Sequence, residues 1–181
     1  FGFMVAGILV KAAIFPVHIW LPAAYSYAPS AVSTLLASIA TKAALYVLAR
    51  ILFTVFSGTP DVVTTALSNV IVPLAVGGVF VGTIMAIYEA DIKKLFAHSS
   101  VAQIGYIALG LGLGTPASVS AAFIHIGNHA LIKGGIFMAI GGFVAALGVR
   151  ASLDSLIGIG RRLPLTATAF LICGLSLAGL P

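Results

Sequence analysis

The sequence has very few charged residues. Only 7% of its 181 residues are Asp, Glu, Lys or Arg, and just four of these are acidic. A soluble domain carries about 25% charged residues, whereas this chain is 61% hydrophobic with a mean hydropathy of +1.20. This composition excludes an ordinary soluble enzyme and predicts an integral membrane protein. We expect an all-α fold, a polytopic bundle of transmembrane helices in a lipid bilayer.

Cysteine is almost absent as well. The single cysteine, Cys173, lies in an apolar run, which excludes a disulfide framework and a cysteine-based metal site. The net charge of +5 does not indicate nucleic-acid binding, because the basic residues are isolated in apolar segments or gathered in two short loops. The chain starts and stops inside apolar runs and shows no signal peptide. We therefore interpret residues 1–181 as one transmembrane domain, part of a longer protein truncated at both ends.

Prolines, glycines and charged residues divide the chain into about six hydrophobic segments. The fourth is short for a hydrocarbon core of about 30 Å, and the fifth is long enough to contain a break near Gly127 or Gly134–Gly135. Residues 16–22 begin and end with proline and predict an interrupted helix. The expected segments are residues 1–15, 29–56, 70–88, 99–113, 117–147 and a last one from 164.

Basic residues in the loops indicate the orientation. Residues 89–94 contain two lysines and residues 150–162 contain three arginines, whereas the loop after residue 56 has only Arg50 at its edge. Positively charged loops stay on the cytoplasmic side. The loops at residues 89–94 and 150–162 are separated by two predicted spans, so both lie on the same side of the membrane. This agreement supports the span assignment.

Three lysines stand in the middle of apolar stretches: Lys11, Lys42 and Lys133. A charge at the bilayer centre costs from about 3 to more than 10 kcal/mol, so such residues usually mark an ion pathway. Lys11 precedes the break at Pro16, where freed carbonyls need protein or water around them. Lys42 lies about 20 Å into its helix, where burial disfavours the charged form and makes the proton transferable. Alternatives remain for both, an interfacial lysine in the first case and a structural lysine in the second.

The run from His125 through His129 to Lys133 places two imidazoles and an ammonium four residues apart. On a helix these groups lie about 6 Å apart on one face, close enough to exchange a proton through one or two waters. A metal site would need a carboxylate or thiolate partner, which the membrane segments lack. Haem needs ligands on opposite sides of its ring. A proton path is favoured because imidazole titrates near neutral pH, and a packed histidine pair is the alternative.

Weaker polar positions accompany these residues. Tyr46 follows Lys42 by one helical turn, and His18 lies within the interruption at residues 16–22. Ser99 and Gln103 form a polar stripe in the fourth segment, a pattern more often used for helix packing. We expect His18, Tyr46, Ser99 and Gln103 to support the path.

Four ordered motifs extend from residue 11 to residue 181: KAAIFPVHIWLP at 11–22 with APSAVS at 28–33, DIKKLFAHSSVAQIGY at 91–106, NHALIK at 128–133 and LSLAGLP at 175–181. Together they resemble one family, the proton-translocating antiporter-like subunits of the membrane arm of NADH:quinone oxidoreductase and of the Mrp multisubunit cation/proton antiporters. The stretch Ala24-Tyr25-Ser26 and the pair Thr41-Lys42 resemble the D-type member of the Mrp complexes in particular.

This resemblance implies a proton relay through Lys11, Lys42, His125, His129 and Lys133. It implies an Mrp-type subunit or, alternatively, a proton-pumping subunit of NADH:quinone oxidoreductase or a related membrane-bound hydrogenase. The expected partners are homologous antiporter-like and small membrane subunits in a bacterial or archaeal cell membrane. Protons are the expected transported ion, and Na⁺ is left open as a second one. No cofactor and no catalytic chemistry are expected in this chain. A haem- or quinone-binding subunit and a passive scaffold are the rival classes.

Overall fold

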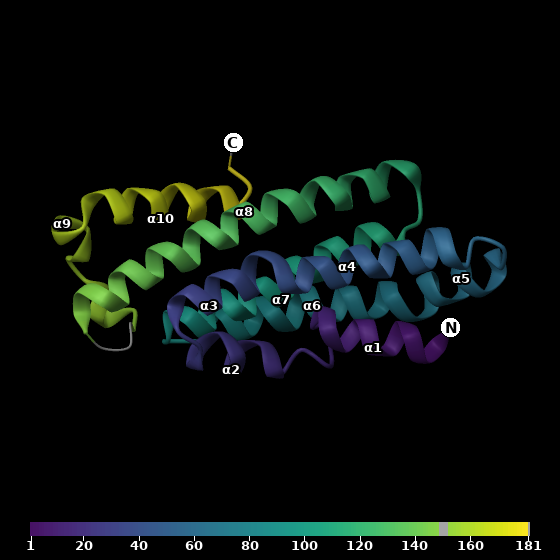
Figure 1. The fold of residues 1–181 in the computed structure, drawn as a ribbon, viewed down its shortest axis with the longest axis horizontal. Coiled ribbons are helices and arrows are strands. Elements are labelled where there is room, and N and C mark those ends of the chain that lie inside the picture. The colour runs from purple at the N-terminus through teal and green to yellow at the C-terminus, as the bar shows by residue number, and fades with distance from the viewer. Residues whose placement is uncertain (149–151, 181) are drawn as a thin grey trace.

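The computed structural model describes residues 1–148 and 152–180, and every regular element in these ranges is helical. Arg150, which contributed to the expected orientation, and Pro181, the last residue of the fourth motif, lie outside them. Figure 1 shows the long helices running side by side, with α8 and α10 along one edge of the bundle. The elements are α1 Gly2–Ala12, α2 Trp20–Tyr27, α3 Ser30–Leu35, η1 Leu36–Ala40, α4 Thr41–Arg50, η2 Ile51–Val55, α5 Pro60–Ala66, η3 Leu67–Ile71, α6 Val72–Ile87, α7 Ile92–Gly112, α8 Pro116–Leu147, η4 Asp154–Leu156, α9 Ile159–Arg162 and α10 Pro164–Leu177.

Four helical stretches among the described residues are long and apolar enough to cross a membrane. They are Ser30–Val55, Pro60–Ile87, Ile92–Gly112 and Pro116–Leu147, and a fifth is obtained if the bent pair Asp154–Arg162 and Pro164–Leu177 forms one span. The apolar α1 is shorter, at 11 residues. The multi-pass helical fold is thus confirmed: of the about six expected segments, four or five are long enough to span, and the first is the shorter α1.

Two predicted spans begin earlier than their hydrophobic runs. The third begins at Pro60, a residue that suits the first helical turn. The fourth begins at Ile92, because the Asp91 carboxylate accepts hydrogen bonds from the backbone N–H groups of Lys93 and Lys94. Its 21 residues extend about 32 Å. The expectation that this span is too short was therefore wrong, and its charged first turn belongs to the helix.

The predicted break in the fifth segment is absent. Helix α8 runs without interruption through Gly127, Gly134 and Gly135. Gly135 allows a neighbour to approach closely, because a Cβ there would meet the Cys173 sulfur of α10 at 2.5 Å, whereas a Cβ on Gly134 would make an ordinary contact with the Ser38 hydroxyl at 3.4 Å. Packing therefore explains these glycines better than helix breaking does.

Interruptions occur elsewhere in the bundle. The expected break near Pro16 is present, since α1 ends at Ala12 and Ala13 adopts a left-handed conformation with φ 57°. The Val10 carbonyl accepts hydrogen bonds from the Ala13 backbone N–H (3.1 Å) and from the Trp20 indole N–H (3.0 Å), and the Ser33 hydroxyl donates to the carbonyl of Tyr25 (2.8 Å). Backbone groups at these breaks thus find partners inside the protein, as membrane burial requires.

Three segments of π-helix, η1, η2 and η3, lie within the second and third spans. A π-helical segment shifts the hydrogen-bond ladder by one residue, and such segments are frequent at functional sites. The first of them, η1, packs against α8. The sequence shows no sign of it, because Leu36–Ala40 contains neither proline nor glycine.

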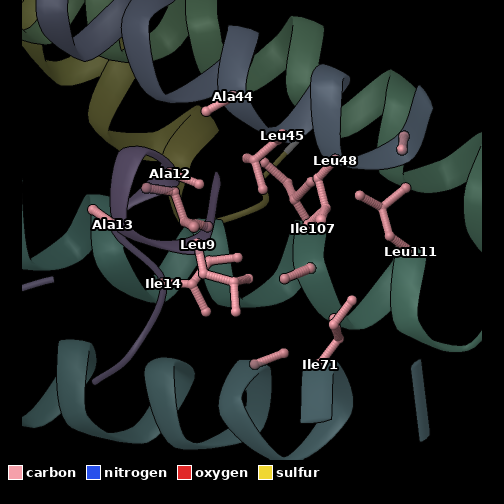
Figure 2. Close-up of a cluster of buried hydrophobic side chains, with 14 of the residues drawn as sticks. Leu9, Ala12, Ala13, Ile14, Ala44, Leu45, Leu48, Ile71, Ile107 and Leu111 are labelled. Carbon is pink, nitrogen blue, oxygen red and sulfur yellow. The ribbon is translucent and has the colours of Figure 1, made fainter. Parts of the chain in front are cut away.

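The hydrophobic core lies between α1, α4, α6 and α7. Figure 2 shows Leu45 and Leu48 of α4 pointing towards Ile107 of α7, with Leu9 and Ile14 of the first segment close by. All five are buried. This core fixes the positions of α4 and α7. Helix α8 packs against α7 and against α3 and η1, which precede α4 in the same span.

Helices α6 and α7 pack most closely, and glycine makes this contact possible. A Cβ on Gly82 would meet the Ala102 backbone nitrogen at 2.6 Å, and one on Gly105 would meet the Ala75 carbonyl oxygen at 2.8 Å. We expect Gly82→Ala and Gly105→Ala each to destabilise the full-length protein by about 1–3 kcal/mol, because backbone atoms must move apart. Thermal unfolding in detergent measures this effect.

The matched control is Gly127→Ala in α8. A Cβ at this position meets nothing within 4 Å among the described residues. Alanine is also the better helix former by about 1 kcal/mol, so this variant should be as stable as the wild type or slightly more stable. Equal stability of all three variants would contradict the proposed close packing of α6 on α7.

Candidate functional site

Lys133 lies at the centre of the buried polar residues. Its side chain projects from α8, is fully buried, and donates hydrogen bonds to the Phe96 carbonyl (2.8 Å) and the Ser99 hydroxyl (2.6 Å) of α7. The ammonium nitrogen also lies 5.2 Å from the centre of the Phe96 ring. Its hydrogen-bond partners are thus neutral oxygens, and the favourable ring contact adds only about 0.5–2 kcal/mol.

Lys42 of α4 is the second buried lysine, with 4% of its surface exposed. Its ammonium donates a hydrogen bond to the carbonyl of Ala37, within the π-helical segment η1. Electrostatic interactions couple Lys42 to His125, His129 and Lys133. Because η1 packs against α8, the π-helical segment that binds the Lys42 ammonium lies against the helix that carries the two histidines.

The two histidines of α8 stack on each other. Their ring centres are 5.9 Å apart and the ring planes differ by only 10°. His129 is fully buried, and neither of its ring nitrogens has a hydrogen-bond partner within the described chain. His125 is half-buried, and its Nε2 lies 2.7 Å from the Gln103 side-chain oxygen of α7. Gln103 and Ser99, one turn apart on α7, thus contact the two ends of the series from His125 to Lys133.

Open space reaches this series from one side. A groove of about 780 Å³ lies between α7, α8 and the end of α10, and its wall includes Gln103, His125, Asn128 and Ser176. A neighbouring cavity of about 480 Å³ is lined by Ser99 and Gln103. Polar side chains therefore connect open space at His125 with the buried His129 and Lys133.

Three of the predicted site residues lie apart from this cluster. Lys11 is exposed on the last turn of α1, so it does not face the interior of the described chain as expected. Tyr46 is also exposed and accepts a hydrogen bond from Arg50 (3.2 Å). His18 is buried, but it stacks loosely on Phe15 in the α1–α2 connection and lines a different cavity.

Some contacts of the site involve groups that sequence reasoning did not select. Tyr25 of α2 is fully buried, donates from its hydroxyl to the Leu36 carbonyl (3.1 Å), and packs edge-on against Phe137 of α8 (5.2 Å). It therefore links the half-helix α2 to η1, beside the carbonyl that binds Lys42. The carbonyls of Ala37 and Phe96 have no sequence signature at all. The sequence signal that could have identified Tyr25 is its position within a short interrupted helix.

The donor set of the cluster does not suit a metal ion. Among the described residues, no group of three or more His, Cys, Asp or Glu side chains is arranged to hold one. The arrangement suits proton exchange, because amine, imidazole and hydroxyl groups lie within one buried series.

Comparison with known proteins identifies the family. The family described as NADH:quinone oxidoreductase/Mrp antiporter, TM, matches residues 1–181. NADH-quinone oxidoreductase subunit N of Desulforudis audaxviator is 44% identical over 179 residues, covering 99% of this chain and 35% of that protein. Among solved structures, the Mrp complex from Dietzia sp. DQ12-45-1b matches with a TM-score of 0.89 and 33% identity, over 98% of this chain and 32% of that one.

A third match is the membrane-bound sulfane sulfur reductase, an archaeal respiratory membrane complex. Its TM-score is 0.85 at 35% identity, and the match covers 98% of this chain and 36% of that one. The chain thus spans about a third of the length of these relatives. They include respiratory and antiporter complexes alike, so the specific resemblance to the D-type Mrp member is not resolved. The family itself is confirmed: the chain belongs to the transmembrane NADH:quinone oxidoreductase/Mrp antiporter family, whose members are integral multi-pass membrane proteins.

Proposed function

We propose that the protein conducts protons through the membrane along Lys42, His129 and Lys133, as an antiporter-like subunit of a multisubunit complex. One observation carries this proposal: within the described ranges both buried lysines bind neutral oxygens, and a buried histidine with two unpartnered nitrogens lies on the same helix as Lys133. A passive scaffold subunit would gain no stability from these buried lysine and histidine side chains.

Energetics support a transferable proton. Removing an ammonium from water costs several kcal/mol, and only a well-placed opposite charge recovers that cost. The oxygens of Ala37, Phe96 and Ser99 stabilise the charge without fixing it, since they bind the neutral amine as well. Lysine can therefore change its protonation state here.

His129 provides the intermediate step. When Lys133 gives a proton to a nitrogen of His129, directly or through water, the amine becomes neutral and the imidazolium carries the charge. The imidazolium then releases the proton from its other nitrogen towards Lys42 or His125. Because like charges on Lys42, His129 and Lys133 repel one another, loading one site favours release from the next.

His125 and Gln103 serve as the exchange point with the groove. His125 is half-buried in its wall, and the 2.7 Å contact with Gln103 holds the ring orientation. Lys11 belongs to the relay only if another part of the protein or a neighbouring subunit covers its face of α1. Homologous membrane subunits are the natural candidates for that contact.

We infer that the parent complex is of the NADH:quinone oxidoreductase type, a proposal supported by the 44% identity to subunit N over nearly the whole chain. Redox chemistry would then belong to other subunits, with flavin, iron–sulfur clusters and quinone outside this chain. An Mrp-type cation/proton antiporter is the second candidate, favoured by the TM-score of 0.89; Na⁺ exchange would distinguish it.

Replacing Lys133 tests the relay. We expect Lys133→Ala in the full-length protein to reduce proton transport by more than about tenfold, because proton transfer by a positioned group contributes at least that much. Assembly should persist, since the substitution also removes a desolvation cost. Lys133→Arg should restore little of the proton transport that Lys133→Ala loses, because guanidinium retains its proton. The measurements are proton uptake into proteoliposomes and native electrophoresis of the complex.

The control for this experiment is Arg161→Ala, which removes an exposed positive charge of α9. It should transport protons at the wild-type rate. Normal transport by an assembled Lys133→Ala complex would refute the proposed relay.

Ser99 provides a finer test. Its hydroxyl accepts a hydrogen bond from the Lys133 ammonium, so Ser99→Ala should slow proton transport severalfold while the Phe96 carbonyl still holds the lysine. Ser99→Thr keeps the hydroxyl and should retain most of the rate. Thr83→Ala, which deletes a hydroxyl that donates within α6 (2.7 Å), is the control. Equal rates for the serine, threonine and alanine forms at position 99 would show that the hydroxyl does not position Lys133.

A further inference from the structure

A second buried pair of titratable side chains lies outside the relay. His18, in the α1–α2 connection, and His98, in the second turn of α7, line one cavity of about 290 Å³ and expose only 4% and 7% of their surfaces. His98 directly precedes Ser99, so on α7 it is rotated by about 100° away from the residue that holds Lys133. The two histidines therefore belong to a separate site.

Their ring nitrogens are not satisfied by the protein. His98 Nδ1 has no hydrogen-bond partner within the described chain, and His18 Nδ1 has no well-formed one, although the Pro16 backbone lies close enough to interact with the ring. An unsatisfied buried polar group costs about 1–3 kcal/mol. An apolar side chain would fill this cavity at lower cost, so these rings indicate a role that depends on polarity.

Charged groups face the histidines at the mouth of the cavity. Half-buried Glu89 and Lys94 contribute to its wall and interact electrostatically with His98, as does His18. Tyr27 of α2 adds an exposed phenol at the rim. The cavity thus connects the charged loop at the start of α7 with two buried imidazoles.

Further polar groups lie beyond the cavity, along α2 and the first turn of α7. Pro22 of α2 lines the cavity, and one turn further along the same face Ser26 has a buried hydroxyl without a partner among the described residues. The Lys93 ammonium donates to the Ala28 carbonyl (3.1 Å), which holds the end of α2 against the first turn of α7. Polar groups therefore continue along the contact between α2 and α7.

We propose that His18 and His98 form a proton-exchange port, through which protons pass between the aqueous phase near Glu89 and Lys94, around the start of α7, and the buried relay. This inference rests on the proposed function. The unpartnered Nδ1 of His98 takes up a proton from water in the cavity, and the ring then releases its other proton from Nε2 along the α2–α7 contact. The ring is left neutral with its proton on Nδ1, and proton exchange with water returns it to the starting tautomer, so that no net proton stays in the port.

The test removes each imidazole and replaces it from solution. His98→Ala and His18→Ala, in the full-length protein within its complex, should slow proton transport by at least about tenfold near neutral pH. Added imidazole should restore a large part of the rate, because the enlarged cavity admits a ring of the missing shape. Pyrazole has the same shape but is not protonated near neutral pH, so it should restore nothing.

Transport is recorded as current across a supported membrane, so that permeation of neutral imidazole does not register, and wild-type complex with imidazole gives the baseline. Met85→Ala is the matched control, because it enlarges the same cavity without removing a titratable group. If His98→Ala fails to assemble, His98→Gln preserves volume and polarity and should show the same loss of current.

The outcomes separate this port from the relay. Normal current in Lys133→Ala refutes the proposed function. A blocked Lys133→Ala complex together with wild-type currents in both histidine variants refutes the port alone. Equal rescue by imidazole and pyrazole would show that the histidines only fill space, and would also refute it.

Discussion

Every backbone N–H and C=O group within the hydrocarbon region must find a partner inside the protein, and this constraint organises the structure. Trp20 donates to the Val10 carbonyl near the end of α1, and Ser33 donates to the Tyr25 carbonyl at the break between α2 and α3. The buried lysines obey the same rule, since Lys42 and Lys133 each bind a backbone carbonyl. For Lys42 the carbonyl belongs to the π-helical segment η1, whereas for Lys133 it belongs to the regular helix α7.

The sequence predicts the helical fold well and its interruptions unevenly. Apolar runs indicate the spans because a bilayer selects for length and hydropathy, and the break near Pro16 follows from proline's missing donor. The predicted break in α8 was wrong, because Gly135 serves close packing against Cys173 of α10, a neighbour that the sequence does not reveal. The π-helical segments carry no local signal, since their hydrogen-bond shift arises from tertiary contacts.

The candidate site, like the fold, is predicted by the sequence only in part. A lysine within an apolar run is costly wherever it points, so Lys42 and Lys133 are conspicuous in the sequence, and helical periodicity brings His125 and His129 together. Lys11 is equally conspicuous and Tyr46 is a weaker signal, yet both are exposed in the described chain. The sequence indicates how deep a residue lies along its helix axis, whereas the packing of the other helices determines which face of that helix is covered.

The scarcity of acidic residues follows from the same physics. All four lie at helix ends or beside them: Asp61 in a first turn, Asp91 as a helix cap, Glu89 just before it and Asp154 at the start of η4. A carboxylate next to Lys42 or Lys133 would form an ion pair and hold the lysine permanently protonated. Neutral oxygens and imidazoles instead leave both protonation states accessible. A chain that moves protons between buried bases therefore needs few acids, and needs them where water already stabilises their charge.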